Sequence, residues 1–218
     1  MRNIVAAVRI TGWKHIPCFA HILNLIVQYR LVSVKDLVNR VKVIVEFFRR
    51  STQATAKLKA MQAQLGEASL NLKQDMVTRW NSTYDMLKRI IILLVKNSLM
   101  SVVAINYPQL NNITNEDITL IDEICDLFKV FKDCTEEMNS EKQVTLSKVI
   151  LLQHAMKNWC TRVQNKAETK DEVRTMAERL LETLNNKFRN IQDNQIIAQA
   201  TFSDPTCKKQ GFSDDRFF

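Results

Sequence analysis

A tryptophan next to an arginine is the first feature of this sequence that could do chemistry. Residues 75–90 read DMVTRWNSTYDMLKRI, in which Trp80 follows Arg79 and precedes three small polar residues. An aromatic face can stack on an unpaired base while an arginine binds the adjacent phosphate. Lys88 and Arg89 add two cations farther along the same stretch. These four residues predict a DNA contact; the alternative is that Trp80 is a structural staple at a helix entrance.

Three potential metal ligands lie close together near the start of the chain. His15, Cys18 and His21 follow a regular spacing of three residues, and both residue types bind zinc. A closed structural zinc site needs four ligands, whereas His154 and Cys160 are remote in the sequence. We interpret Cys18 and His21 as packing residues, with zinc as the alternative, and predict no metal and no cofactor.

The distribution of carboxylates argues against phosphoryl-transfer chemistry. Two-metal catalysis needs acidic residues that hold ions about 3.5–4 Å apart, but residues 1–74 contain only Asp36, Glu46 and Glu67. The acidic cluster at residues 122–126 falls on an amphipathic segment, which indicates a solvated helix face. No glycine-rich phosphate loop and no nucleophile beside a histidine is found. We predict that the chain is not an enzyme and has no small-molecule substrate.

Composition favours long helices in an intracellular protein. The 218 residues include only three Gly and three Pro, and 46% of them are hydrophobic, so a turn-rich all-β fold is disfavoured. The five cysteines form no CxxC pair, which is typical of reduced thiols. No apolar run approaches the roughly 20 residues that span a bilayer. We therefore expect no membrane contact and no secretion.

Positive charge is concentrated in the first half of the sequence. The net charge is +8, and residues 1–100 hold 16 Lys and Arg against five Asp and Glu. This asymmetry is typical of a surface that faces a polyanion, most often nucleic acid. The alternative is a basic helical domain whose charge serves solubility alone. DNA is thus one candidate partner and other proteins are the second.

Helical periodicity runs through most of the chain, because apolar residues recur every three or four positions. Possible capping boxes begin at Thr114 and Thr169, and Gly66 predicts a helix end. The predicted helices cover residues 2–11, 20–29, 34–48, 53–65, 80–97, 114–131, 145–163 and 169–190. The connections near residues 140 and 166 are short enough for antiparallel neighbours.

One segment does not fit a helical bundle. Gly12 ends the first predicted helix, and Pro17 disfavours helix at Ile16. We therefore expect a short strand at about His15–Phe19, between two helices, as in a layer of an α/β fold. From Ser203 onward the sequence offers no core face, so a poorly ordered tail is predicted.

Three segments, in this order, resemble motifs of the hAT superfamily of DNA transposases. They are PCFAHILNLIV at 17–27, DMVTRWNSTYDML at 75–87 and ATFSDP at 200–205. The first is specific because Cys18 and His21 precede a Leu-Asn-Leu centred on Asn24, and the second because of its Arg-Trp-Asn-Ser-Thr. The third is degraded at Thr206 and Cys207. The sequence looks most like the domesticated BED-type zinc-finger relatives of that superfamily.

The resemblance implies an RNase H-like domain interrupted by a long all-α insertion. Residues 1–32 would then be a remnant of the RNase H-like part, 33–202 the all-α insertion domain and 203–218 the tail. The family's catalytic carboxylates, BED finger and dimerisation segment are expected to lie outside this chain. In the family, the tryptophan that matches Trp80 is associated with a base flipped out of donor DNA. The resemblance therefore assigns Arg79 and Trp80 to DNA handling, and Cys18, His21 and Asn24 to a structural motif.

Together these observations predict a mainly α bundle of long helices, similar to a hAT insertion domain, with a remnant strand near the N-terminus. The predicted function is a non-catalytic, transposase-derived chain that is nuclear and associated with transposon ends or with DNA in general. A helical protein-interaction module without nucleic-acid binding is the alternative. A third interpretation is an incomplete gene product without a stable function.

Overall fold

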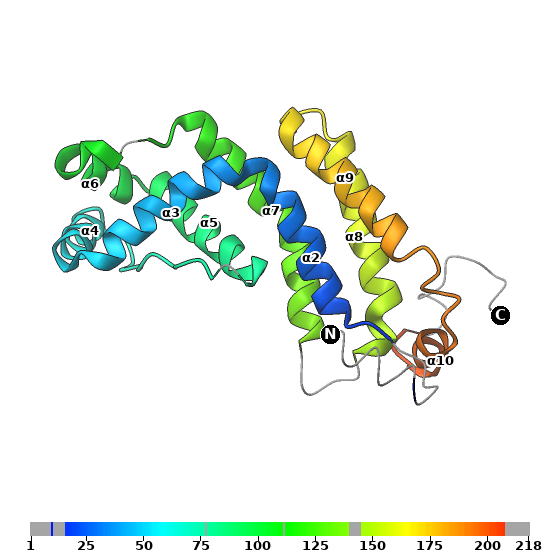
Figure 1. Cartoon of the computed structure of the whole chain (residues 1–218). Coiled ribbons are helices and arrows are strands. Elements are labelled where there is room, and N and C mark those ends of the chain that lie inside the picture. Colours follow the sequence, from blue (N-terminus) through cyan, green and yellow to red (C-terminus); the bar gives the residue numbers. More distant parts are fainter. Residues whose placement is uncertain (1–9, 11–15, 77, 111, 140–144, 208–218) are drawn as a thin grey trace.

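The computed structural model describes residues 10, 16–76, 78–110, 112–139 and 145–207, and every regular element in these ranges is helical (Figure 1). The predicted mainly α fold is therefore confirmed. The helices are α2 (Phe19–Leu31), α3 (Lys35–Arg50), α4 (Thr52–Gln64), α5 (Trp80–Val95), α6 (Ser98–Asn106), α7 (Asn115–Met138), α8 (Val149–Asn165), α9 (Asp171–Lys187) and α10 (Gln195–Ser203). The 3-10 turns are η1 (Val32–Val34), η2 (Pro108–Leu110) and η3 (Leu146–Lys148).

α7 is the element around which the described helices are arranged. It is 24 residues long and packs against α2, α5, α8 and α9. α8 and α9 lie side by side, and α2 packs across α7 and α9 (Figure 1). α3, α4, α5 and α6 form a second group, which joins α7 through α5 (Figure 1). α7 thus links the two groups of helices.

The buried face of α7 shows why the sequence folds in this way. Ile121, Ile124, Phe128 and Phe131 follow spacings of three and four residues, and each is at most 1% exposed. Burying one such side chain contributes about 1.5–3 kcal/mol. A single apolar core extends from α2 to α10, so α2 shares the core of the bundle. The domain boundary proposed at residue 32 stays a prediction.

Helix ends follow the sequence where the local capping chemistry is strong. The box at Thr114 is confirmed: its Oγ1 accepts from the Asp117 N–H at 3.1 Å, and Asp117 Oδ2 accepts from the Thr114 N–H at 2.9 Å. Gly66 has the expected positive φ of 66° just beyond α4. The box at Thr169 is wrong, because α9 begins at Asp171 and the Thr169 hydroxyl donates to the Val163 carbonyl at 3.2 Å.

Two predictions for the ends of the chain need correction. The strand at His15–Phe19 is not shown, because residues 16–18 are irregular and Phe19 already begins α2. His15 lies outside the described residues, as does the helix predicted at 2–11 except for Ile10. The tail was expected to have no core face from Ser203 onward. Asp204 instead accepts a hydrogen bond from Ser147 Oγ at 2.5 Å, and Cys207 is 2% exposed. The rest of the predicted tail lies outside the described residues.

The helix predicted at residues 80–97 is present as α5, which is slightly shorter than predicted. α5 ends at Val95, and Asn97 adopts a left-handed φ of 64° before α6 begins. Neither α6 nor α10 was predicted from the sequence.

Over the described ranges no single helix is long and apolar enough to cross a membrane. α5 and α6 meet the length and apolar criteria only when taken together, and they are bent by 79° relative to each other.

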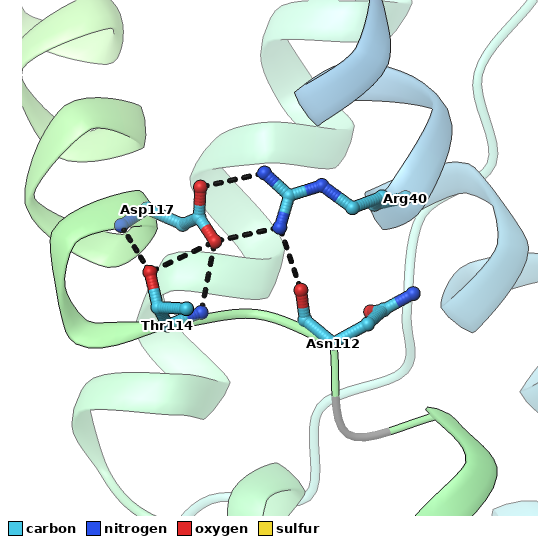
Figure 2. A network of polar contacts seen from close by, with 4 residues as sticks. All are labelled: Arg40, Asn112, Thr114 and Asp117. Carbon is cyan, nitrogen blue, oxygen red and sulfur yellow. Dashed lines mark hydrogen bonds and ion pairs between the residues drawn. The ribbon is translucent and has the colours of Figure 1, made fainter.

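A charged clamp joins α3 to the start of α7 (Figure 2). Arg40 binds both carboxylate oxygens of Asp117, at 2.6 and 2.7 Å, and also donates to the Asn112 carbonyl at 2.6 Å. The Arg40 hydrogen bonds lower the pKa of Asp117 to about 2, against a smaller opposing effect of burial. One carboxylate therefore caps α7 and fixes α3 against it; this pairing was not predicted from the sequence.

Candidate functional site

The two segments that resemble family motifs meet in the structure. Asn24 on α2 accepts a hydrogen bond through its Oδ1 from the backbone N–H of Trp80, the first residue of α5, at 3.1 Å. Asn24 and Trp80 lie 56 residues apart in the sequence. The hydrogen bond satisfies one of the free N–H groups at the helix start. The LNL and RWNST motifs thus form one structural unit, the α2–α5 junction.

Trp80 is buried in this junction. Its side chain is 2% exposed, and its ring lies 6.1 Å from the Tyr84 ring and 6.0 Å from the Phe128 ring. The indole Nε1 has no hydrogen-bond partner among the described protein atoms. The packing is that of a structural staple, and no indole face is open to a base in this conformation.

A buried carboxylate organises the polar residues after Trp80. Asp75 is 5% exposed and binds Lys42 Nζ at 2.6 Å, Thr83 Oγ1 at 2.7 Å and Ser82 Oγ at 3.0 Å. Burial alone would raise the pKa of Asp75, but the hydrogen bonds from these three residues outweigh it and lower the pKa. Asp75 and Lys42 were missed as site residues, although a carboxylate shortly before a Ser-Thr pair is a recognisable signal.

This network fixes the backbone of Arg79 and leaves its side chain free. The Met76 N–H donates to Ser82 Oγ at 2.8 Å, and the Arg79 N–H donates to the Met76 carbonyl at 3.0 Å. The Arg79 side chain is exposed and has no ion pair or hydrogen bond within the described part of the chain. The Arg79 guanidinium is therefore exposed to solvent while the backbone that carries it is fixed.

Arg79 borders a shallow polar depression of about 530 Å³. It lies where α2, the start of α5 and the end of α7 come together. Its lining residues are Ala20, His21, Asn24, Arg79, Trp80, Asn81, Thr135 and Asn139. Amide, imidazole and guanidinium groups are side chains that bind phosphate and sugar oxygens, so this surface is suited to an anionic, hydrogen-bonding partner.

The structure separates the other two cations predicted for DNA contact from Arg79. Lys88 pairs with Asp122 of α7 at 3.4 Å, and Arg89 donates to the Asn71 carbonyl at 2.7 Å. Both lie about 14 Å along the axis of α5 from Arg79, from the helix rise of 1.5 Å per residue. Arg79 and Trp80 thus share the depression, whereas Lys88 and Arg89 belong to other surfaces.

The cysteines and histidines show no metal-like grouping in the ranges that the structure covers, where no three or more His, Cys, Asp or Glu side chains could share an ion. Cys18 is exposed at the N-terminal end of α2 and His21 is half-buried on its first turn. Burial raises the pKa of Cys125, Cys134 and Cys160 to about 12 each. These three thiols are neutral core residues.

Comparison with known proteins confirms the resemblance drawn from the motifs. Residues 16–127, just over half of the chain, match the family described as the ZBED1 RNase-like helical domain. The chain is 27% identical over 203 residues to zinc finger BED domain-containing protein 4 of Homo sapiens, which covers 92% of this chain and 17% of that protein.

Two further relatives agree. Zinc finger BED domain-containing protein 6 of Homo sapiens is 30% identical over 157 residues, 70% of this chain and 15% of that protein. A Zea mays protein named "Putative AC transposase" is 26% identical over 214 residues, 89% of this chain and 24% of that protein. The chain spans at most 24% of the length of these three relatives.

Proposed function

Because the chain belongs to the family of the ZBED1 RNase-like helical domain, we propose that it is a non-catalytic, transposase-derived module that contacts DNA in the nucleus. The proposed contact is made by Arg79 at the depression of the α2–α5 junction. The nuclear location follows from the proposed partner. The relatives named as BED zinc-finger proteins and as a transposase support the connection with DNA.

The proposal is supported chiefly by the guanidinium of Arg79, which has no partner in the described part of the chain. Several other cations of this half of the chain are held by carboxylates, such as Arg40 by Asp117 and Lys42 by Asp75. Arg79 has an exposed side chain and a fixed backbone. Arginine binds phosphate through two parallel N–H groups, so a pre-positioned and unpaired arginine is suited to the DNA backbone.

The proposed contact is to the DNA backbone and not to a flipped base. Base stacking needs an open aromatic face, and Trp80 is packed against Tyr84 and Phe128. The role of Trp80 in this proposal is to fix the start of α5, and therefore the position of Arg79. The amides around the depression provide additional donors for phosphate and sugar oxygens.

The non-catalytic part of the proposal is supported by the contacts that the buried carboxylates make within the protein. Asp75 and Asp117 each neutralise a cation and receive hydroxyl hydrogen bonds. On α7, Glu123 accepts the Lys170 N–H at 2.9 Å and Asp122 pairs with Lys88. Acids committed to such contacts are structural, whereas metal catalysis needs acids that converge on one ion.

Arg79→Gln tests the DNA contact. Binding of the full chain to a short labelled duplex is measured over a range of salt concentrations. The loss of one phosphate contact should reduce the slope of log affinity against log salt by about 0.9. Lys129→Gln removes one exposed charge of α7 and is the matched control. An Arg79→Gln slope equal to that of Lys129→Gln would contradict the proposal.

The absence of catalysis is tested on supercoiled plasmid with Mg²⁺ or Mn²⁺. No nicking above a metal-free control is expected. Nicking that co-purifies with the chain and disappears when one of its own acidic residues is replaced would refute the non-catalytic assignment.

An exposed apolar stripe along α2 and the start of η1 favours the second candidate, a helical protein-interaction module. Leu25, Tyr29 and Val32 follow spacings of four and three residues and are 53%, 69% and 61% exposed. Such a stripe is more apolar than an ordinary solvated helix face. If the wild-type chain shows no salt-dependent affinity for duplex DNA, this second function replaces the first.

A further inference from the structure

We infer that a second surface, formed by Arg49, Lys59 and Arg89, contacts the phosphodiester backbone of DNA. We call these three residues the basic patch. The inference rests on the proposed association with DNA, but it uses none of the residues that border the Arg79 depression. Arg49 and Lys59 were not predicted as DNA contacts, and Arg89 was predicted only from its position near Trp80.

The fold brings the basic patch together from three helices. Arg49 is in the last turn of α3, Lys59 is on α4 and Arg89 is on α5. Arg49 and Lys59 border a hollow of about 210 Å³ whose lining also includes Leu70, Asn71 and Leu72. Arg89 reaches the same segment, because its Nη1 donates to the Asn71 carbonyl at 2.7 Å. Residues up to 40 positions apart in the sequence therefore surround one segment of chain.

The segment at the centre of the patch is firmly held. The buried side chain of Gln62 binds both the N–H and the carbonyl of Leu70, at 3.2 and 3.1 Å, and Leu72 is 6% exposed. Because the backbone is fixed on both sides of Asn71, the Asn71 carbonyl that binds Arg89 has a defined position. The guanidinium of Arg89 has five N–H donors, so its bond to Asn71 leaves others for an anion.

The cations of the patch lack acidic partners in the described part of the chain. Among the residues that the structure describes, no carboxylate lies within ion-pair distance of Arg49, Lys59 or Arg89, whereas Glu46 pairs with the neighbouring Arg50 at 3.7 Å. Elsewhere on α5, Lys88 is matched by Asp122. Like charges gathered without counter-charges repel one another, and a bound anion relieves that repulsion.

A polymer of phosphates fits this surface better than a single small anion. Arg49 and Lys59 are exposed, and salt screens the attraction of exposed charges for an isolated ion. A nucleic acid gains in addition from the release of condensed counterions, once for each phosphate that the protein neutralises. Three cations around one segment of chain offer such a polymer up to three phosphate contacts. The chemistry of the patch therefore points to the DNA backbone.

The test is the double variant Arg49→Gln/Lys59→Gln of the full chain, with Arg89 kept because its bond to Asn71 is structural. Affinity for a short labelled duplex of mixed sequence is measured at about 50 and 200 mM salt. Loss of two contacts should reduce the salt slope by about 1.8, so the fall in affinity between the two salt concentrations becomes about 12-fold smaller than in wild type. Urea denaturation should show unchanged stability.

The matched control is Lys129→Gln/Arg162→Gln, which also removes one lysine and one arginine, both exposed, from α7 and α8. Its salt slope should equal that of wild type. An equal change in both double variants, or no change in either, would overturn the inference. So would displacement of DNA from the wild type by polyglutamate at equal charge, because carboxylates would then serve as well as phosphates.

The experiment separates this inference from the proposed role of Arg79. If Arg79→Gln reduces the salt slope and Arg49→Gln/Lys59→Gln does not, the basic patch is refuted as a DNA contact and the proposed function stands. If only the double variant reduces the salt slope, the basic patch stands and the Arg79 contact is refuted. Responses to both place DNA on two surfaces of the molecule.

Discussion

Replacing Trp80 distinguishes a core residue from a base-stacking residue. The indole is 2% exposed and packs against Tyr84 and Phe128, and truncation of such a side chain to alanine costs about 3–5 kcal/mol. Part of this cost is offset because Nε1 has no hydrogen-bond partner among the described protein atoms, and an unpaired buried polar group costs about 1–3 kcal/mol. We therefore expect Trp80→Ala to lose about 3 kcal/mol of unfolding free energy.

A loss of that size is a large fraction of the roughly 5–15 kcal/mol that stabilises a domain, so a milder variant is needed as well. Trp80→Leu keeps apolar volume and should cost less, about 2 kcal/mol, while removing any capacity to stack. Stability is measured by urea denaturation, followed by circular dichroism. Affinity is measured on the same samples for an intact duplex and for a hairpin with unpaired bases.

If Trp80 is a core residue, Trp80→Leu weakens folding and leaves the ratio of hairpin to duplex affinity unchanged. The opposite pattern would refute the assignment: nearly unchanged stability together with a hairpin-specific loss of about 1–3 kcal/mol, which is the contribution of one stacked base. In that case the indole must leave the core when DNA binds, and the packing against Phe128 describes only the free state.

Two further predictions concern buried carboxylates. Asp117→Asn should lower the unfolding free energy by about 1–2 kcal/mol at pH 7, a value reduced for the partial exposure of Arg40. Because the folded pKa of Asp117 is about 2 and lies below the unfolded value, the stabilisation is present above about pH 4 and is lost as the pH falls towards 2. The stabilities of wild type and variant, measured by urea denaturation, should therefore converge in acid. Asp75→Ala should cost about 2–4 kcal/mol because Lys42 loses its partner, whereas Glu168→Ala, at the exposed pair with Lys166, should cost less than about 1 kcal/mol. Equal losses in urea denaturation would contradict this.

Much of the fold could be predicted because the decisive signals are local. The periodic run predicted at 34–48 corresponds to α3 at Lys35–Arg50, and the capping box at Thr114 is present. The nine-residue helices α6 and α10 were missed because short segments show too few turns for a clear period. The box at Thr169 is absent because α9 begins at Asp171, and the Lys170 N–H before it donates to Glu123 of α7, a tertiary contact that local sequence does not show.

The candidate site was only partly predictable. The motif identified Arg79 and Trp80, but burial of Trp80 depends on Phe128, which is 48 positions away on another helix. The pairing of Lys42 with Asp75 likewise depends on how α3 lies against the loop before α5. Sequence spacing shows which residues share a helix face, but it does not show which faces meet.

The charge distribution illustrates this limit and gives a quantitative bound on DNA binding. The excess of cations in residues 1–100 is partly neutralised by α7, where Asp117 forms an ion pair with Arg40 and Asp122 forms one with Lys88. The two surfaces proposed for DNA together offer four cations, Arg79 and the three residues of the basic patch. At about 0.9 per phosphate contact, the slope of log affinity against log salt should be no steeper than about −3.6. A much steeper slope would show that cations outside these two surfaces also contact phosphates, either exposed ones such as Lys35 and Lys96 or those released when the ion pairs to α7 open.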